Sequence, residues 1–363
     1  MTGTTAALHE LGQYCDMAVR HSYDQYEKHG TLLTKAAAAF HDETVWDEKW
    51  VPDDFDVCDA ASHPVWQGFT REQKLAWNHL QWALDYSAVA QGERQIIVLN
   101  NFAVREYGHI LPSVCELERR ESFEETDHIE AFCVVLEGIR ARYFKTRAEP
   151  LWSIPASGFS NATLNRLSRH ALGTVATYLL GSNFPTLFFL ARGMKTHGFK
   201  PFENSIVSNE EGHAAIRMIS HLHRLDESRH MATSLNLARL SAAVLESLPR
   251  DNRLLFKMAV QAAFPKGRSA DYRLVYWRQV LDESTIYADI PKVERDALYA
   301  HLEARIQANL VSLHERQARL TRQANKRIVE ECGLSPQMKR LFVDTMRADP
   351  AYAATVDAVR LDA

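Results

Sequence analysis

The chain has 363 residues, of which 46% are hydrophobic and 24% are charged, and its formal net charge is -4. This is the composition of a globular protein with a full core, which excludes a disordered chain, a collagen-like chain and a strongly basic nucleic-acid-binding protein. The five cysteines form no Cys-x-x-Cys pair, and the N-terminus lacks the basic start and apolar stretch of a signal peptide. We therefore expect a cytoplasmic protein without a disulfide framework or a zinc ribbon.

Glycine and proline are sparse, and apolar residues recur at helical spacing over long stretches, so the sequence predicts an all-α fold. Residues 1–68 are expected to form a helical and then irregular lead-in. A capping box at Thr70 and Gln73 predicts the start of the first long helix, and a similar pattern at Ser208 and Glu211 predicts the start of the fourth. The four long helices are expected at about residues 71–102, 112–144, 164–191 and 208–248, with a loop over 193–202.

The remaining residues, 249–363, keep the helical pattern, with expected breaks near Pro265, Pro291 and Pro336. No linker separates this extension from the four long helices. We therefore expect a single domain over 1–363, made of the lead-in over 1–68, a four-helix core over 69–248 and a helical extension over 249–363.

Residues 171–191 carry no charged side chain, and a length near 20 raises the question of a membrane span. The run contains Pro185, Asn183, Ser182 and three threonines, and it lies between amphipathic helices. We therefore expect a helix buried on nearly all sides within a bundle, and no membrane association.

The pattern Glu-x-x-His places a carboxylate and an imidazole one helical turn apart on the same face, where both can reach one metal ion. It occurs four times in the chain, at Glu106/His109, Glu125/His128, Glu210/His213 and Glu227/His230. The first pair lies beside Gly108 at a probable helix end and is interpreted as a surface pair. The remaining pairs are distinguished by the faces on which they lie.

Two of these pairs lie on apolar helix faces. The face of Glu125 and His128 continues through Phe132 and Leu136, and His223 lies on the same arc as Glu227 and His230. Glu93 lies on a further apolar face, that of the first long helix. A buried carboxylate is normally paired, protonated or bound to a metal, so a buried arginine partner for Glu93 and a hydrogen-bonded polar patch at 223–230 are the alternatives to metal binding.

The face of Glu210 and His213 continues into Arg217 and Arg224, which indicates a partly solvated surface. We expect only a possible additional or indirect role for these two residues. The inward set is therefore Glu93, Glu125, His128, His223, Glu227 and His230. Three carboxylates and three imidazoles on facing helices are typical of a pair of iron or manganese ions, whereas a zinc hydrolase typically uses three protein ligands.

At these residues the sequence resembles ferritin-like di-iron oxygenases. The segment with Glu125 and His128, FEETDHIEAF, looks like their second ligand helix, and LHRLDESRHMA is similar to the His-x-x-x-Glu-x-x-His helix of the p-aminobenzoate N-oxygenase family. The segment with Glu93, QGERQIIVLNNF, resembles that family's first ligand helix. The resemblance covers about residues 75–240 and implies a ferritin-like long-helix bundle with additional N- and C-terminal helices.

One feature departs from this family, whose third helix supplies another glutamate. Residues 151–202 contain no Asp or Glu, and Ala176 or Thr177 stands where that carboxylate is expected. Three explanations are open: a more open site with six protein ligands, a carboxylate reaching in from Glu203, Glu210 or Glu211, or a site that holds its second metal weakly. Heme-oxygenase-like di-iron oxygenases also use three histidines and three carboxylates, but their other ligand spacings fit less well.

The resemblance implies an O2-dependent oxygenase that converts a free or carrier-bound amine into hydroxylamine, nitroso or nitro products. Such an enzyme would contain two iron ions, with manganese as the alternative, and would need an external electron donor, because the chain has no flavin, Rossmann or iron–sulfur motif. The alternatives are a di-iron enzyme that hydroxylates or desaturates carbon, a peroxidase, and a metal-storing or structural helical protein. A homodimer is possible, and no nucleic-acid partner is expected.

Overall fold

The computed structural model describes residues 2–144, 175, 179–181, 183–244, 253–264 and 268–361. Within these ranges the regular elements are α-helices and short 3-10 helices, with no β-strand. This architecture confirms the predicted all-α class. The main helices are α1 Thr2–His29, α2 Leu32–Ala39, α3 Pro64–Gln67, α4 Arg71–Tyr107, α5 Pro112–Tyr143, α7 Asn183–Ser208, α8 Ala214–Val244, α9 Arg253–Ala263, α10 Arg268–Glu283, α11 Lys292–Glu331 and α12 Pro336–Arg347.

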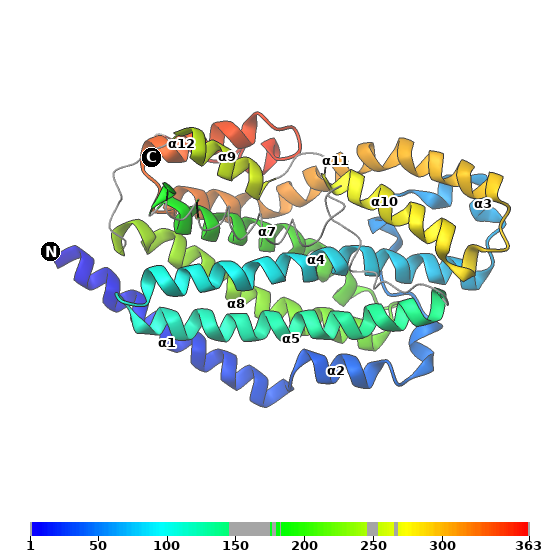
Figure 1. The fold of residues 1–363 in the computed structure, drawn as a ribbon, viewed down its shortest axis with the longest axis horizontal. Coiled ribbons are helices and arrows are strands. Elements are labelled where there is room, and N and C mark those ends of the chain that lie inside the picture. Colours follow the sequence, from blue (N-terminus) through cyan, green and yellow to red (C-terminus); the bar gives the residue numbers. More distant parts are fainter. Residues whose placement is uncertain are drawn as a thin grey trace.

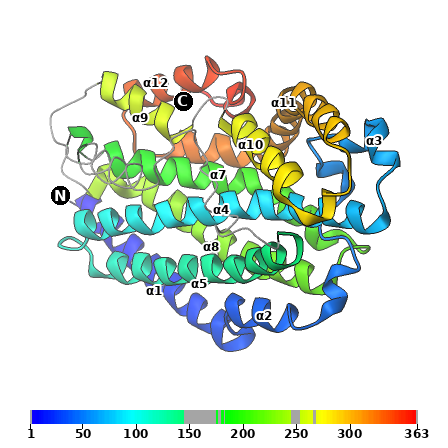
Figure 2. The same cartoon turned by 45° about the vertical axis from the view of Figure 1, so that its right-hand side comes forward.

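Four long helices, α4, α5, α7 and α8, form the centre of the molecule. Helix α4 packs along α5, and α7 packs along α8. In both ribbon views these helices follow the long axis, with α1 and α2 on one side and α9, α11 and α12 on the other (Figures 1 and 2). Helices α1 and α2 pack against both α5 and α8, and α11 packs against α7.

The helix starts and ends follow the sequence prediction in several places. The predicted capping box is present, because the Thr70 hydroxyl accepts from the Gln73 backbone N–H and the Gln73 side chain accepts from the Thr70 N–H. The first long helix extends five residues further than predicted, to Tyr107, and the second ends at Tyr143. Helices α11 and α12 begin next to Pro291 and at Pro336, as predicted.

The predicted start of the fourth long helix at Ser208 is wrong. Ser208 is the last residue of α7, and its hydroxyl donates to the backbone carbonyl of Asn204 at 2.7 Å. Helix α8 begins at Ala214, where the His213 ring accepts from the Ala215 N–H at 3.2 Å. His213 therefore caps the start of α8, whereas the sequence predicted Ser208 as the capping residue.

The predicted loop over residues 193–202 is also wrong, because α7 runs through it without a break. Gly193 is needed for packing: a Cβ built at this position would lie 2.3 Å from Cδ1 of Ile328 on α11. Pro201 lies inside the helix, where it removes one backbone donor but does not end the helix. Much of the predicted helix at 164–191, including Thr177, lies outside the described residues.

The part of the 171–191 run that the structure describes includes the first turns of α7. Leu187, Phe189 and Leu190 are buried there, as expected for an internal helix. No helix among the described residues is long and apolar enough to cross a membrane.

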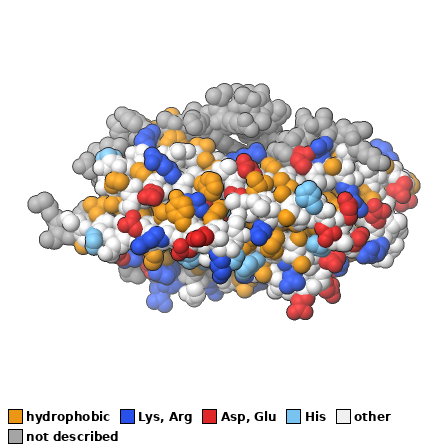
Figure 3. Space-filling model, turned by 90° about the horizontal axis from the view of Figure 1, so that it is seen from below, with side chains coloured by type: hydrophobic (Ala, Val, Ile, Leu, Met, Phe, Trp, Pro, Cys, Tyr) orange, Lys and Arg blue, Asp and Glu red, His pale blue; other side chains and the backbone are white. Residues whose placement is uncertain are grey.

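Two apolar clusters fill the interior, one towards each end of the bundle. One includes Leu80, Leu136 and Ile219, and the other includes Val114, Leu190 and Leu237. Between them, α5 from Glu118 to His128 and α8 from His223 to Ser234 bury polar and charged side chains. We call this region the polar layer. The outer surface, by contrast, mixes hydrophobic and charged side chains over the face seen in Figure 3.

Candidate metal centre

The polar layer brings together all six residues that the sequence singled out. They form two overlapping groups whose donor atoms lie within 4.8 Å of one another: Glu93, His128, His223 and Glu227 in the first, and Glu125, Glu227 and His230 in the second. Every member is buried, and Glu227 belongs to both groups. The six come from α4, α5 and α8, as the helical spacing predicted.

In the first group, the carboxylate of Glu93 lies between two imidazoles. Its Oε1 is 2.9 Å from Nε2 of His223 and 3.5 Å from Nδ1 of His128. The same Nε2 atom is 3.9 Å from Oε1 of Glu227. Among the described residues Glu93 contacts no arginine. The alternative, a buried ion pair between Glu93 and an arginine, is therefore absent from this part of the chain.

In the second group, His230 faces two carboxylates. Its Nδ1 is 3.0 Å from Oε1 of Glu227 and 3.2 Å from Oε1 of Glu125. The two groups are adjacent, because Oε2 of Glu125 lies 3.7 Å from Nδ1 of His128. The side chains are therefore arranged so that two metal ions could bind next to each other and share Glu227 as a ligand.

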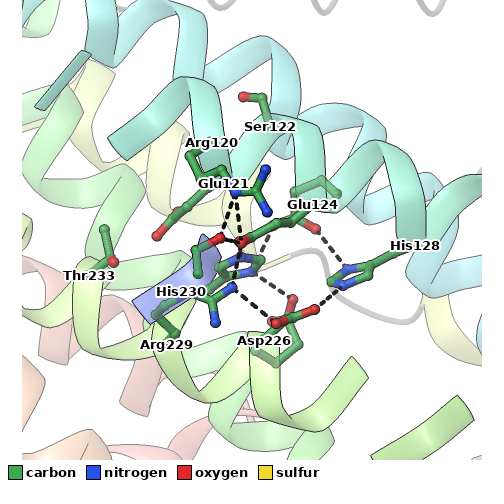
Figure 4. A network of polar contacts seen from close by, with 12 residues as sticks. Arg120, Glu121, Ser122, Glu124, His128, Asp226, Arg229, His230 and Thr233 are labelled. Carbon is green, nitrogen blue, oxygen red and sulfur yellow. Dashed lines mark hydrogen bonds and ion pairs between the residues drawn. The ribbon is translucent and has the colours of Figure 1, made fainter. Parts of the chain in front are cut away.

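Each of the three histidines also has a carboxylate behind it, on the ring nitrogen that points away from the other donors. Nε2 of His128 lies 3.1 Å from Asp226, and Nε2 of His230 lies 2.7 Å from Glu124. Figure 4 shows Asp226 placed between His128 and Arg229. The third partner is Glu203 on α7, which pairs with Nδ1 of His223.

These outer carboxylates have a clear physical consequence. A ring N–H that donates to a carboxylate leaves the opposite nitrogen with its lone pair, which is the form of histidine that binds a metal. The inner nitrogens are Nδ1 of His128, Nε2 of His223 and Nδ1 of His230, and each points towards the glutamates of its group. The histidines are thus oriented as ligands.

Several inward-facing polar atoms lack a hydrogen-bond partner among the described residues. They include Oε2 of Glu93, Oε2 of Glu125 and Nδ1 of His128, all buried. A buried polar group without a partner is costly, and carboxylate and imidazole donors are those that iron and manganese take in proteins. The unsatisfied atoms therefore fit a site that metal ions complete.

Charge leads to the same conclusion. Seven buried carboxylates contact the three histidines directly or through Arg192: Glu93, Glu121, Glu124, Glu125, Glu203, Asp226 and Glu227. Three arginines contact this set, namely Arg120, Arg192 and Arg229. With neutral histidines, four negative charges remain without a partner. Two divalent cations would neutralise them, and unpaired buried charges are otherwise expensive.

Without metal, protonation of the histidines neutralises part of this negative charge. Burial alone lowers the pKa of His223, but the neighbouring carboxylates Glu203 and Glu93 outweigh it and raise the pKa to about 10. Burial is outweighed in the same way at His128 and His230, whose pKa values lie well above the ordinary value. Metal ions that bind here must therefore displace protons from the imidazoles.

Helix α7, which includes the described end of the predicted third long helix, contributes a cation to the polar layer. The Arg192 guanidinium is 2.6 Å from Glu121 and 2.9 Å from Glu125. Glu203, at the other end of α7, lies behind His223 on the outer side of the ring. Thr177 lies outside the described residues. Among the described residues of α7, no carboxylate joins either donor group.

The structure separates the other reserve candidates from the polar layer. Glu210 is exposed in the turn between α7 and α8, and His213 precedes the first residue of α8. Because His213 lies ten residues before His223, it is about 15 Å away along the helix axis. Neither Glu210 nor His213 belongs to either of the two donor groups, and both lie apart from the polar layer. Their region joins the lead-in through the His213 N–H, which donates to the Lys49 carbonyl.

Sequence reasoning missed the outer carboxylates Glu124 and Asp226 and the arginines that hold them. Each acid directly precedes a predicted ligand, so a helical wheel places it 100° away at the edge of the inward face. Whether a side chain at that edge is buried can be decided only once the neighbouring helices are known. A clearer signal was available at Glu118 and Glu121, which repeat the face of Glu125 at helical spacing and are both fully buried.

The chain has similarity to one described protein family. Residues 16–184 match the model of the CylC-like acyl halogenase family, a span just under half of the chain. The span contains Glu93, Glu125 and His128 and ends before α8. That family is described as one of acyl halogenases, and the chain is similar to it over this span alone. The similarity does not extend to N-oxygenation.

Searches of curated proteins and of solved structures gave no match.

Proposed function

We propose that the protein is a non-heme oxidative enzyme with two metal ions in the polar layer, iron with manganese as the alternative. One ion would be held by Glu93, His128, His223 and Glu227, and the other by Glu125, Glu227 and His230. The observation that carries this proposal is the pair of buried donor groups that share Glu227. The four unmatched negative charges support two divalent ions in place of one.

The chemistry supplied by such a centre is the oxidation of an unreactive bond with O2 and two electrons from an external donor. The protein's own contribution is to fix the donors and exclude water. The two apolar clusters close both ends of the polar layer, and the acids behind the histidines hold the ring orientation. Three neutral imidazoles among the donors leave more positive charge on the metals than carboxylates would.

The family similarity favours carbon as the atom that is oxidised, with an acyl chain as substrate. Halogenation converts a C–H bond, a halide ion, O2, two electrons and three protons into a carbon–halogen bond and two water molecules. The enzyme would therefore need a halide and an external reductase. Without halide, O2, two electrons and two protons convert a C–H bond into an alcohol and one water molecule. With the same reactants, desaturation removes two hydrogens from neighbouring carbons and forms two water molecules.

N-oxygenation of an amine, free or carrier-bound, is the second candidate. The observation that favours it is the helix bearing His223, Glu227 and His230, whose spacing is similar to that of the p-aminobenzoate N-oxygenase family. Both reactions use the same donors and the same external electrons. The product distinguishes them.

Metal content tests the centre itself. Protein produced with iron should bind about two ions per chain, and Glu227→Ala should lose metal from both groups. Glu130→Ala is the matched control, because Glu130 lies on α5 within the same stretch but is exposed. Full metal content in Glu227→Ala would overturn the shared-ligand assignment. No metal in the wild-type protein would favour a structural helical protein.

Product analysis tests the reaction. The iron-loaded protein should be incubated with a chemical reductant, O2 and either chloride or bromide, together with carrier-bound and free acyl chains and a panel of aryl and alkyl amines. We expect mass spectrometry to find a halogen or an oxygen on an acyl carbon. Oxygen on nitrogen alone would instead support the second candidate. O2 consumption without any modified substrate in the panel would contradict both.

A further inference from the structure

Oxidisable aromatic rings lead from the metal centre to the end of α5. The Tyr86 ring lies 6.2 Å from His223 and stacks on Trp82 at 4.1 Å with 15° between the ring planes. From Trp82 the next ring is Trp50, at 5.8 Å, followed by Trp46 at 5.2 Å. We call Tyr86, Trp82, Trp50, Trp46 and Tyr143 the aromatic chain.

The last member, Tyr143, lies 6.0 Å from Trp46 and is paired with a base. Nε2 of His79 lies 2.8 Å from the Glu48 carbonyl, which only accepts, so this nitrogen carries the ring proton. Nδ1 of His79 must then accept the hydroxyl proton of Tyr143, at 2.7 Å. Burial lowers the pKa of His79 to about 3, so the ring is neutral and free to take that proton.

The Tyr86 hydroxyl, at the other end of the chain, is also hydrogen-bonded. Its hydroxyl lies 2.8 Å from the Ser220 hydroxyl and 3.4 Å from Oε1 of Glu203. Trp82, in the middle, differs: among the described residues its indole N–H has no acceptor. A proton can therefore leave the ring at the Tyr143 end of the chain but is retained at Trp82, as transfer through that ring requires.

Packing alone does not require this choice of side chains. Phenylalanine fills a buried apolar site as well, and it avoids the hydroxyl and indole N–H groups that need partners. The chain instead uses the two most easily oxidised aromatic side chains at five successive positions. All five are nearly or fully buried, and Trp46 is 7% exposed at the outer end.

We propose that the aromatic chain carries oxidising equivalents away from the metal centre to Tyr143 when no substrate is bound. This inference rests on the proposed oxidative function. The route protects the ligands, because an oxidising equivalent that stays among Glu93, His223 and His230 would modify them. The oxidising equivalent ends on Tyr143, which is paired with His79 and becomes a tyrosyl radical.

The transfer balances at each step. Trp82 gives up an electron to the centre through the Tyr86 ring, whose phenol keeps its proton. Trp50 then reduces Trp82, and Trp46 reduces Trp50, each by single-electron transfer. Tyr143 finally loses an electron to Trp46 and its proton to Nδ1 of His79. A small thiol or ascorbate then returns one electron and releases its own proton to water, while Nδ1 of His79 returns the phenol proton to Tyr143.

The outer half of the route can be tested with a redox-inactive metal in the centre. A ruthenium photo-oxidant is attached to Asp47→Cys, an exposed position next to Trp46, in zinc-loaded protein whose Cys115 and Cys133 are replaced by serine. After flash oxidation we expect the electron paramagnetic resonance signal of a tyrosyl radical. The signal should be lost in Tyr143→Phe and kept in Tyr287→Phe.

Tyr287 is the matched control, because it is fully buried but donates to the Gln73 carbonyl, which cannot take a proton. A radical that persists in Tyr143→Phe would overturn the assigned end of the chain. Absence of any tyrosyl radical in the labelled parent protein would overturn the route. Neither result depends on whether the protein is an oxidative enzyme.

The inner half is tested with iron. The reduced, iron-loaded protein is mixed with O2 in the absence of substrate and frozen, and the radical at Tyr143 is measured. We expect the signal to be lost in Trp82→Phe and retained in Trp82→Tyr, which keeps an oxidisable ring. An equal signal in Trp82→Phe would overturn the proposal, as would O2 consumption without any radical. Absence of O2 consumption would instead count against the proposed function.

Discussion

Oε2 of Glu124 lies 2.7 Å from Nε2 of His230. This nitrogen is on the side of the imidazole that faces away from the other metal-binding groups. Arg229 contacts the same carboxylate at 2.6 Å, and Ser22 of α1 donates to it. The acid is therefore fixed from two helices besides its own. This rigidity makes Glu124 a device that sets the direction of the His230 lone pair.

Removal of this carboxylate should weaken metal binding and leave the fold intact. In Glu124→Gln the amide keeps its size but loses the charge that favours the His230 N–H, so we expect the affinity for iron to fall by about 10–100-fold. Competition with a chelator measures it. Glu130→Gln, an exposed change on the same helix, should bind iron as the wild type does. Equal affinities for the two variants would contradict the orienting role.

Loss of Arg192 should destabilise the metal-free protein strongly. Arg192→Met leaves Glu121 and Glu125 buried without their cation, and breaking such a pair costs about 3–5 kcal/mol. Urea unfolding monitored by circular dichroism measures the free energy of unfolding. The double variant Arg192→Met/Glu121→Gln removes one of the two unpaired charges and should recover part of the loss.

Surface ion pairs provide the comparison. Lys292→Met breaks an exposed pair with Asp296 and should change the free energy of unfolding by less than about 1 kcal/mol. If Arg192→Met were as mild as Lys292→Met, the charge balance described for the polar layer would be incorrect.

The sequence predicted the fold class and the inward set of donors because both follow from helical periodicity, which is local. Glu125, His128, His223, Glu227 and His230 could be placed on inward faces without knowing which helices meet. The outer acids could not, because Glu124 and Asp226 lie at the edges of those faces. Their burial depends on long-range contacts, namely Ser22 of α1 and Arg229 of α8 for Glu124, and His128 of α5 for Asp226.

The path of α7 shows the same limit. Glycine and proline at 193, 198 and 201 predicted a loop from local preference, whereas the helix continues because Gly193 allows α11 to approach closely. A glycine selected for contact between helices is indistinguishable in sequence from one that ends a helix. The structure, and not the pattern, assigns its role.

This contact leads to a prediction about Gly193→Ala. Alanine favours a helix by about 1 kcal/mol relative to glycine, but here its Cβ meets Cδ1 of the buried Ile328, and overpacking costs about 1–3 kcal/mol. We expect net destabilisation in thermal or urea unfolding. Ile328→Val removes the atom that clashes, so Gly193→Ala should be less harmful, or stabilising, in that background. The same loss in both backgrounds would place the strain elsewhere.

Acid should destabilise the protein through His79. Its pKa falls from the ordinary value of 6.5 to about 3 in the folded state, because burial disfavours the charged ring. Below pH 6.5 the unfolded chain binds a proton that the folded chain does not, so stability is lost as pH falls, by about 1.4 kcal/mol per unit until pH nears 3.

In His79→Gln, the amide can keep contacts with Glu48 and Tyr143 but cannot titrate. The free energy of unfolding of metal-free protein, measured by urea unfolding from pH 7 to 4, should therefore fall less steeply in the variant than in the wild type. Parallel curves would show that His79 is protonated in the folded protein, and the Tyr143 hydroxyl would then lack its proton acceptor.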